Sequence, residues 1–301
     1  MQRPVPGEHF AEHEDGDIQA CTDLRNQMIL ANMNGLGAAF VVDPLNGLDR
    51  REFLGLPAGW EASFANPDVR TAFTNFTLWI VREFEPHYLG LASEINTYMD
   101  NHPGDVASYV SLYKETYGAI KSEAPDTQVF VTFQWDDLNN MFAGANEGRA
   151  AYDTNWDQIE AFEPQLDLWV ISSYPYVAFP NGEPIPAEYY TPLLTRTDKP
   201  LAVAEGGYSA QDIDGIHGSE GGQVDYLNAI HDQLGERLAF WVYLLLSDFD
   251  FDDYIRLMEQ QGIDTEDIST LGFFAHVGLM TVEGEPRPAL ELWQSFRSSR
   301  D

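Results

Sequence analysis

Two glutamates stand where short apolar segments of the sequence end. Glu94 closes the segment 87–94, and Glu205 closes the segment 199–205. Each run of small and apolar residues predicts a buried strand with a carboxylate at its carboxyl end. In a barrel of parallel strands, catalytic groups gather at that rim. Two carboxylates that face one another there are the groups needed to cleave a glycosidic bond. Alternatively, each glutamate is a helix cap or a loop acid.

Other polar and aromatic residues at predicted strand ends are candidates for contact with a sugar: Asp43, Asn96, Gln134, Trp135, Asp136, Tyr174 and Tyr176. Aromatic faces and polar rims bind sugars, so Trp135, flanked by Gln134 and Asp136, is the expected platform unless it is structural. Asp43 ends a strand and is expected to bind a hydroxyl or to cap a helix. Asn96 could instead stabilise a turn.

Strands and helices alternate along the whole sequence. Strands are predicted at 37–42, before Glu94, at 128–133, at 166–172, before Glu205 and at 238–246. Helices are predicted at 15–33, capped by Asp15 or Asp17, and at 67–84, 103–124, 155–161, 186–195, 219–234 and 287–299. A repeat of about 35–40 residues predicts parallel strands with helical crossovers, in an α/β barrel or a doubly wound sheet.

The number of strands is short of a full barrel. Six strands are convincing, whereas a complete barrel of this type needs eight. The first 36 residues hold one helix and one poor strand around His9-Phe10-Ala11. No phosphate-binding glycine motif follows any strand, which argues against nucleotide binding. Without a tandem repeat or a Gly/Ser linker, residues 1–301 are expected to form a single catalytic domain.

The order of the strand-end motifs resembles clan A of the glycoside hydrolases, which are retaining (β/α)8 enzymes. Ser93-Glu94-Ile-Asn96 resembles its strand four, 167–176 strand six, 202–208 strand seven, and 278–293 the closing turn and last helix. The similarity is particularly close to endo-galactanases and to some family 5 enzymes, and it covers about residues 37–297. It implies that strands three to eight are visible and that the barrel is incomplete at the N-terminus.

The resemblance also implies a role for each glutamate. Glu205 would attack the anomeric carbon, and Glu94 would act as acid and then base, with the carboxyl groups about 5–5.5 Å apart. Tyr174 would orient Glu205 through a phenol hydrogen bond; its alternative is a core tyrosine beside a proline turn. The clan places an Asn before the acid/base Glu to bind the substrate's 2-hydroxyl, but Ser93 stands there. Asn96, two residues past Glu94, is expected to replace that Asn unless it serves a turn.

The function expected from these features is a retaining glycoside hydrolase of carbohydrate metabolism, acting on β-linked oligo- or polysaccharides. One alternative is a catalytically weak or dead carbohydrate-binding protein with an incomplete barrel. A more distant one is a lyase or isomerase on an α/β barrel. An assay on a panel of aryl β-glycosides at high salt separates them.

The chain is strongly acidic. Its formal charge is −33, from 49 acids against 16 bases in 301 residues. Nucleic acid and anionic membranes are polyanions, so neither is an expected partner. The charge favours a halophilic protein, cytoplasmic in a salt-accumulating cell or secreted with its signal removed. An acid-adapted secreted enzyme and an acidic mesophile are the alternatives.

Neither a cofactor nor a metal is expected. The lone Cys21 excludes an internal disulfide framework. His9 and His13 have helical spacing, but no third ligand is identifiable. The run 247–253 alternates acids as a calcium loop does, but lacks the glycine and closing Glu of an EF-hand, which favours a solvated loop. No run of 18 apolar residues occurs, and residues 1–8 show no apolar segment of a signal peptide.

A homodimer is expected because a sheet that starts at strand three has two bare edges, 37–42 and 238–246. The open side would be covered by the partner across more than about 2,000 Å². In the rival arrangement, residues 1–14 fold back and leave a monomer. Light scattering at molar salt distinguishes the two, since one chain weighs 33.9 kDa and a dimer twice that.

Salt should increase both activity and thermal stability. At molar NaCl or KCl the Debye length falls to about 3 Å, which screens the repulsion among the acidic groups. We therefore expect the melting temperature to rise from low salt to molar salt. A melting temperature that stays flat or drops over this range would contradict the halophilic interpretation.

Overall fold

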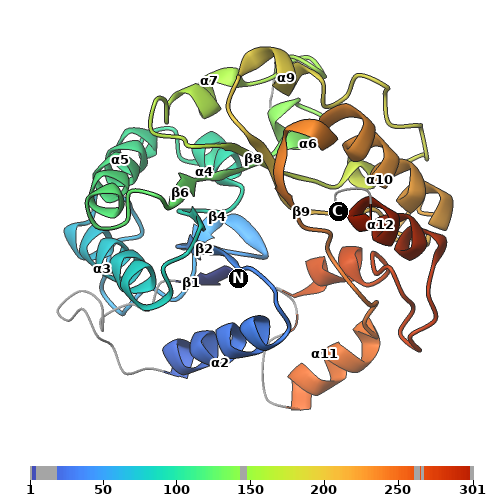
Figure 1. The fold of residues 1–301 in the computed structure, drawn as a ribbon, viewed down its shortest axis with the longest axis horizontal. Coiled ribbons are helices and arrows are strands. Elements are labelled where there is room, and N and C mark those ends of the chain that lie inside the picture. Colours follow the sequence, from blue (N-terminus) through green and yellow to red (C-terminus); the bar gives the residue numbers. More distant parts are fainter. Residues whose placement is uncertain (1, 5–18, 143–147, 261–264, 266–267, 299–301) are drawn as a thin grey trace. The chain divides into compact units, whose positions relative to one another are not determined.

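The computed structural model describes residues 2–4, 19–142, 148–260, 265 and 268–298 (Figure 1). By its internal contacts the chain divides into two compact units. The first consists of residues 1–134 and 154–170, and the second of residues 135–153 and 171–301. None of the helices in the described ranges is both long enough and apolar enough to span a membrane.

The first unit is built on a parallel sheet with the strand order β1-β2-β5-β6. Its strands are β1 (Gln2–Pro4), β2 (Ala39–Asp43), β5 (Tyr88–Gly90) and β6 (Gln128–Phe130). The long helices between successive strands are α2 (Gln19–Met33), α3 (Pro67–Phe84) and α5 (Val106–Glu123). All three were predicted, within a few residues at their ends, and this part of the alternation is confirmed.

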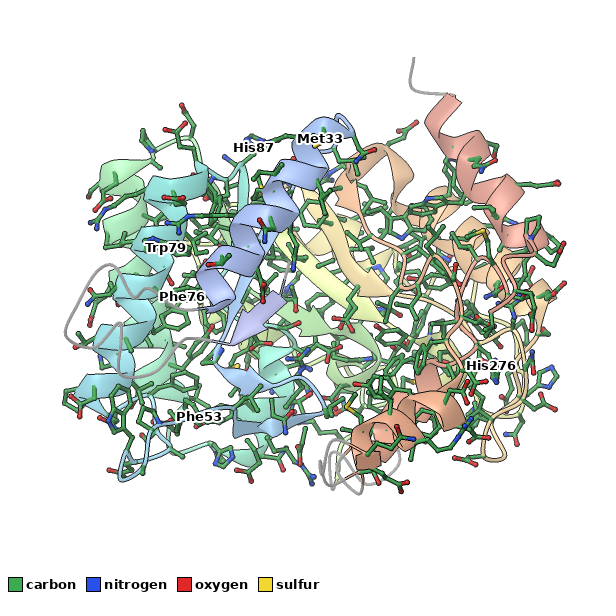
Figure 2. All side chains as sticks on the ribbon, turned by 90° about the horizontal axis from the view of Figure 1, so that it is seen from below. Met33, Phe53, Phe76, Trp79, His87 and His276 are labelled. Atoms are coloured by element: carbon green, nitrogen blue, oxygen red, sulfur yellow. The ribbon has the colours of Figure 1, made fainter. Side chains whose placement is uncertain are left out.

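The helix α3 shows why these residues form the predicted element. The Asn66 side chain accepts the Asp68 N–H at 3.0 Å, and Pro67 occupies the first turn, where a missing N–H costs nothing. Glu85 ends the helix in the left-handed region. One face is buried, through Val69, Ala72, Phe73, Phe76, Thr77, Trp79, Ile80 and Val81. On it Phe76 and Trp79, labelled in Figure 2, stack with ring centroids 5.7 Å apart.

Shorter elements follow the strands of the first unit. They are the antiparallel hairpin β3 (Leu45–Asn46) and β4 (Asp49–Phe53), then α4 (Ile95–Asn101), β7 (Thr132–Gln134) and α7 (Trp156–Glu160). Phe53, labelled in Figure 2, anchors the hairpin by packing on Phe64 and Tyr98, with ring centroids 4.7 and 5.8 Å away. Neither the hairpin nor α4 was predicted, since both fall between the periodic segments.

The second unit contains the strands β9 (Leu201–Gly206) and β10 (Leu238–Trp241), which pair in parallel, and the end of β8 (Trp169–Ser173) beside β9. Its helices are α6 (Trp135–Leu138), α8 (Pro175–Ala178), α9 (Pro192–Arg196), α10 (Glu220–Leu234), α11 (Phe251–Gln260) and α12 (Pro288–Ser298), with 3-10 turns η1 (Gly235–Arg237) and η2 (Ser269–Phe274). The predicted helix 219–234 is confirmed, with Ser219 as its cap.

Three predictions about the elements need correction. The strand predicted over 238–246 ends at Trp241, and the helix predicted over 186–195 begins only at Pro192. The segment 37–42 is not a bare edge, because β1 pairs with β2 along that side. Residues 2–4 therefore cover the edge of β2, as the monomeric alternative expected of the N-terminal segment.

β1 also changes the strand count. If β5 is the fourth barrel strand, β2 is the third and β1 the second. Pro4 lies in β1 and has no N–H, which is typical of an edge strand. The predicted strand at residues 9–11, the caps Asp15 and Asp17, and the pair His9 and His13 lie outside the described residues. The homodimer stays a prediction, although one of its two proposed edges is covered.

Two glycines offer a matched test of packing in the first unit. A Cβ on Gly90 in β5 would lie 2.8 Å from the Phe130 ring and 3.1 Å from Val41, whereas one on Gly118 in α5 meets nothing within 4 Å. We expect Gly90→Ala to lower the free energy of unfolding by about 1–3 kcal/mol. Gly118→Ala should raise it by about 0.5–1 kcal/mol. Urea denaturation measures both, and equal midpoints for the two variants would contradict this account.

Candidate active site

Asp43 ends β2 as a buried carboxylate. One oxygen accepts the N–H of Leu45 at 3.1 Å, which begins the β3–β4 hairpin. The other forms a close ion pair with Arg50. The expectation that Asp43 caps a helix is therefore wrong: it fixes the hairpin turn and a guanidinium instead.

Glu94 follows β5 in a strained backbone conformation. Its φ is 49°, in the left-handed region, which a non-glycine residue occupies at a cost of about 1–3 kcal/mol. Its N–H donates to the Thr132 hydroxyl at 2.8 Å, and its carboxylate accepts from Arg50 Nε at 3.3 Å. Glu94 stands at the N-cap position of α4, as the alternative interpretation expected, but its side chain makes no capping hydrogen bond. Such strain clusters at functional sites.

Arg50 is a site residue that the sequence interpretation missed. It lies on β4, its side chain is 8% exposed, and it contacts both Asp43 and Glu94. Nothing in the segment 45–53 marks it, because the neighbouring Arg51 is identical in type. Only the pairing of β3 with β4 turns one of the two arginines inward.

Asn96 is buried in α4 and is engaged by the main chain of Gln134. Its amide donates to the Gln134 carbonyl at 3.2 Å and accepts the Gln134 N–H at 2.8 Å. These two hydrogen bonds join α4 to β7, and they satisfy the main chain of Gln134 as a neighbouring strand would. The expectation that Asn96 replaces the Asn missing before Glu94 gets no support from this geometry.

Trp135 begins α6 in the second unit and is fully buried. Its indole N–H donates to the Tyr189 carbonyl at 3.2 Å, and its ring lies against Tyr190 with centroids 6.4 Å apart. Because protein covers the indole faces, the prediction of an open sugar platform is wrong.

Asp136 is a buried acceptor rather than a polar rim residue. Its carboxylate accepts from Tyr189 Oη at 2.6 Å, from the Tyr174 N–H at 2.8 Å and from Ser173 Oγ at 3.2 Å. Burial, and then the charge of Asp136, raise the pKa of Tyr189, so that phenol stays protonated as a donor. Asp136 thus fixes the main chain of Tyr174.

Glu205 lies in the last two residues of β9 and is half-buried. Tyr174 Oη donates to Glu205 Oε1 at 2.5 Å, the contact that the family resemblance implied. The Tyr174 ring is itself held edge-on by Phe274, with centroids 5.0 Å apart. A tyrosine that is positioned by its neighbours therefore fixes the orientation of this carboxylate.

The two glycines after Glu205 are required by close backbone approaches. A Cβ on Gly206 would lie 2.7 Å from the Ser173 carbonyl oxygen, and one on Gly207 would lie 2.5 Å from that of Leu244. The Gly207 N–H bonds the same Ser173 carbonyl at 3.3 Å. This packing holds the end of β9 against the residue that precedes Tyr174.

Tyr176 was also predicted to contact substrate, but it is fully buried. Its hydroxyl donates to the Phe273 carbonyl at 2.8 Å, and burial raises its pKa. A phenol that is covered by protein and already donating has no free face for a sugar. Tyr176 is therefore a structural residue of the second unit.

Residues 247–253 were predicted to form a solvated loop. The prediction is wrong for the first acid of that run, Asp248. It is buried and forms a two-pronged pair with Arg287, at 2.8 and 2.6 Å. It also accepts the Gly278 N–H at 2.8 Å, where a Cβ on Gly278 would collide. His276, labelled in Figure 2, lies 3.5 Å away. Within the described ranges, no three His, Cys, Asp or Glu side chains group as metal ligands would.

No family model matches the sequence, and no curated protein matches it. Solved structures are similar to it. An exo-β-1,4-mannosidase from Opitutaceae bacterium strain TAV5 has a TM-score of 0.63 at 15% identity, over 99% of this chain and 52% of the mannosidase. Fungal β-1,4-galactanases give 0.60 at 14%, over 97% and 86%. A β-glucuronidase from an uncultured Clostridium sp. gives 0.55 at 14%, over 91% and 42%.

These similarities establish the fold. The chain has the α/β fold of TIM-barrel glycoside hydrolases, and among its described residues the strand pairings do not close a ring. The resemblance to clan A and the prediction of an incomplete barrel are thus confirmed at the level of the fold. The chain spans about half the length of the mannosidase.

Proposed function

We propose that this chain is a retaining glycoside hydrolase that cleaves β-linked glycosides, with Glu205 as nucleophile and Glu94 as acid and base. The observation that carries the proposal is the 2.5 Å hydrogen bond from Tyr174 to Glu205. A strand-end carboxylate held in one orientation by a phenol suits attack on an anomeric carbon. The strained backbone of Glu94, also at a strand end, supports its part in the pair.

The reaction has two steps, each of which inverts the configuration of the anomeric carbon. In the first, Glu205 forms a bond to the anomeric carbon while Glu94 gives its proton to the departing glycosidic oxygen. In the second, Glu94 takes a proton from water, the water oxygen bonds to the anomeric carbon, and Glu205 leaves as a carboxylate. The enzyme returns to its starting protonation state, and the configuration of the sugar is retained.

Double displacement needs two carboxyl groups, which retaining enzymes hold about 5–5.5 Å apart. Glu94 belongs to the first unit and Glu205 to the second. The substrate is an oligo- or polysaccharide, in line with the galactanases and the mannosidase among the structural neighbours.

A carbohydrate-binding protein with weak or no activity is the second candidate. Ser93 stands where clan A places its Asn, and the amide of Asn96 is occupied by the main chain of Gln134. In such a protein neither residue would supply the contact to the 2-hydroxyl that strengthens in the transition state. Binding of glycans without turnover at molar salt would favour this candidate.

Substitution of either glutamate tests the catalytic roles. Glu94→Gln and Glu205→Gln should each lower kcat by at least about a thousandfold on unactivated β-glycosides, since each removes an indispensable group. Azide should rescue Glu205→Ala with a product of inverted configuration, because it replaces the missing nucleophile directly. Near-normal rates in either Gln variant would overturn the assignment.

Matched controls lie at the opposite ends of strands. Glu85 precedes β5, and Glu236 precedes β10; both are exposed. Because the amino-terminal side of such strands carries no chemistry in this fold, Glu85→Gln and Glu236→Gln should leave kcat unchanged. An equal loss in the controls would point to a general effect of charge rather than to catalysis.

A further inference from the structure

A buried guanidinium lies between two carboxylates in the first unit, one at the end of β2 and one just before α4. The side chains of Asp43, Arg50 and Glu94 are 3%, 8% and 13% exposed. One terminal nitrogen of Arg50 contacts Asp43, and Nε lies 3.3 Å from Glu94 Oε2. The two carboxylates are thus joined through a single cation.

The elements of the first unit bring these groups together. β2 and β5 are parallel neighbours, with Val41 opposite Gly90, so their carboxyl ends lie at the same edge of the sheet. The hairpin after β2 then places β4 next to α4. Arg50 therefore reaches Glu94 from a rigid element, which orients a side chain better than a loop does.

Both ends of the contact are fixed by further hydrogen bonds. Leu45 holds Asp43, and the Thr132 hydroxyl holds the main chain of Glu94. With its backbone fixed, Glu94 can still rotate about its side-chain bonds. The contact with Arg50 restrains the carboxyl group at the end of that side chain. A misplacement of about 1 Å in a reacting group can cost a hundredfold in rate, so such a restraint has catalytic value.

The charge of Arg50 is balanced within the cluster. The closer contact of Arg50 is with Asp43, whose negative charge offsets the cation. Arg50 can thus orient Glu94 while its charge is balanced elsewhere.

We propose that Arg50 is a positioning residue for proton transfer by Glu94, and that Asp43 holds Arg50 rather than binding a sugar hydroxyl. This inference rests on the proposed function. In the competing account, the ion pairs serve only to stabilise the hairpin.

The test compares substrates that differ only in their leaving group. Phenyl β-glycosides of glucose, galactose and mannose need the proton, whereas their dinitrophenyl counterparts depart with little help. For Arg50→Ala we expect kcat/KM to fall about a hundredfold on the phenyl substrate and less than about threefold on the dinitrophenyl one. Added guanidinium should restore the phenyl activity, and NaCl at equal ionic strength should not.

Arg51 provides the matched control. It is the next residue on β4, its side chain is 58% exposed, and it pairs with Asp49. Arg51→Ala should change neither rate. If Arg50→Ala fails to fold, Arg50→Lys serves instead: it keeps the charge but lacks the Nε–H donor and should show the same dependence on leaving group. Asp43→Asn should show it as well.

An equal loss on both substrates, or no loss on either, would overturn the positioning role. Glu94→Gln distinguishes this failure from that of the proposed function. If Glu94→Gln discriminates between the leaving groups and the Arg50 variants do not, only the present inference falls. If Glu94→Gln does not discriminate either, the acid role of Glu94 falls and takes the inference with it.

Discussion

The constraint on which the first unit depends is that two carboxylates lie near the carboxyl ends of neighbouring parallel strands, Asp43 as the last residue of β2 and Glu94 four residues after β5. β2 and β5 bring Asp43 and Glu94 to one edge of the sheet, and burying both charges without a cation would be costly. Arg50 supplies that cation, and the β3–β4 hairpin is the means by which the chain turns it inward. The aromatic packing of Phe53 that anchors the hairpin thereby also serves the charged cluster.

In the second unit, neutral donors hold Asp136 and Glu205, whereas Asp248 is paired with Arg287. Asp136 accepts from three donors, including the main chain of Tyr174, and the phenol of Tyr174 in turn donates to Glu205. A hydroxyl stabilises a carboxylate without adding a charge. The phenol of Tyr174 therefore acts on Glu205 by orienting its carboxylate more than by electrostatic attraction. Substitution at Asp136 would therefore affect Glu205 through Tyr174.

The acidic composition of the chain and its buried ion pairs have different physical causes. The chain carries 16 basic residues against 49 acids, yet two of its arginines, Arg50 and Arg287, are buried beside carboxylates. On a salt-screened surface an unpaired acid costs little, whereas a buried one needs a partner. The interior of this protein therefore pairs these charges locally.

The sequence by itself determined the alternation of strands and helices, because this follows from local periodicity, and it placed Glu205 at the end of β9 and Glu94 shortly after β5. It also indicated the contact between Tyr174 and Glu205, through the order of its motifs. Only the tertiary structure decided that Trp135 is covered and that Arg50, rather than Arg51, turns inward. Burial and charge pairing join segments that are distant in the chain, and hydropathy periodicity carries no information about which of them meet.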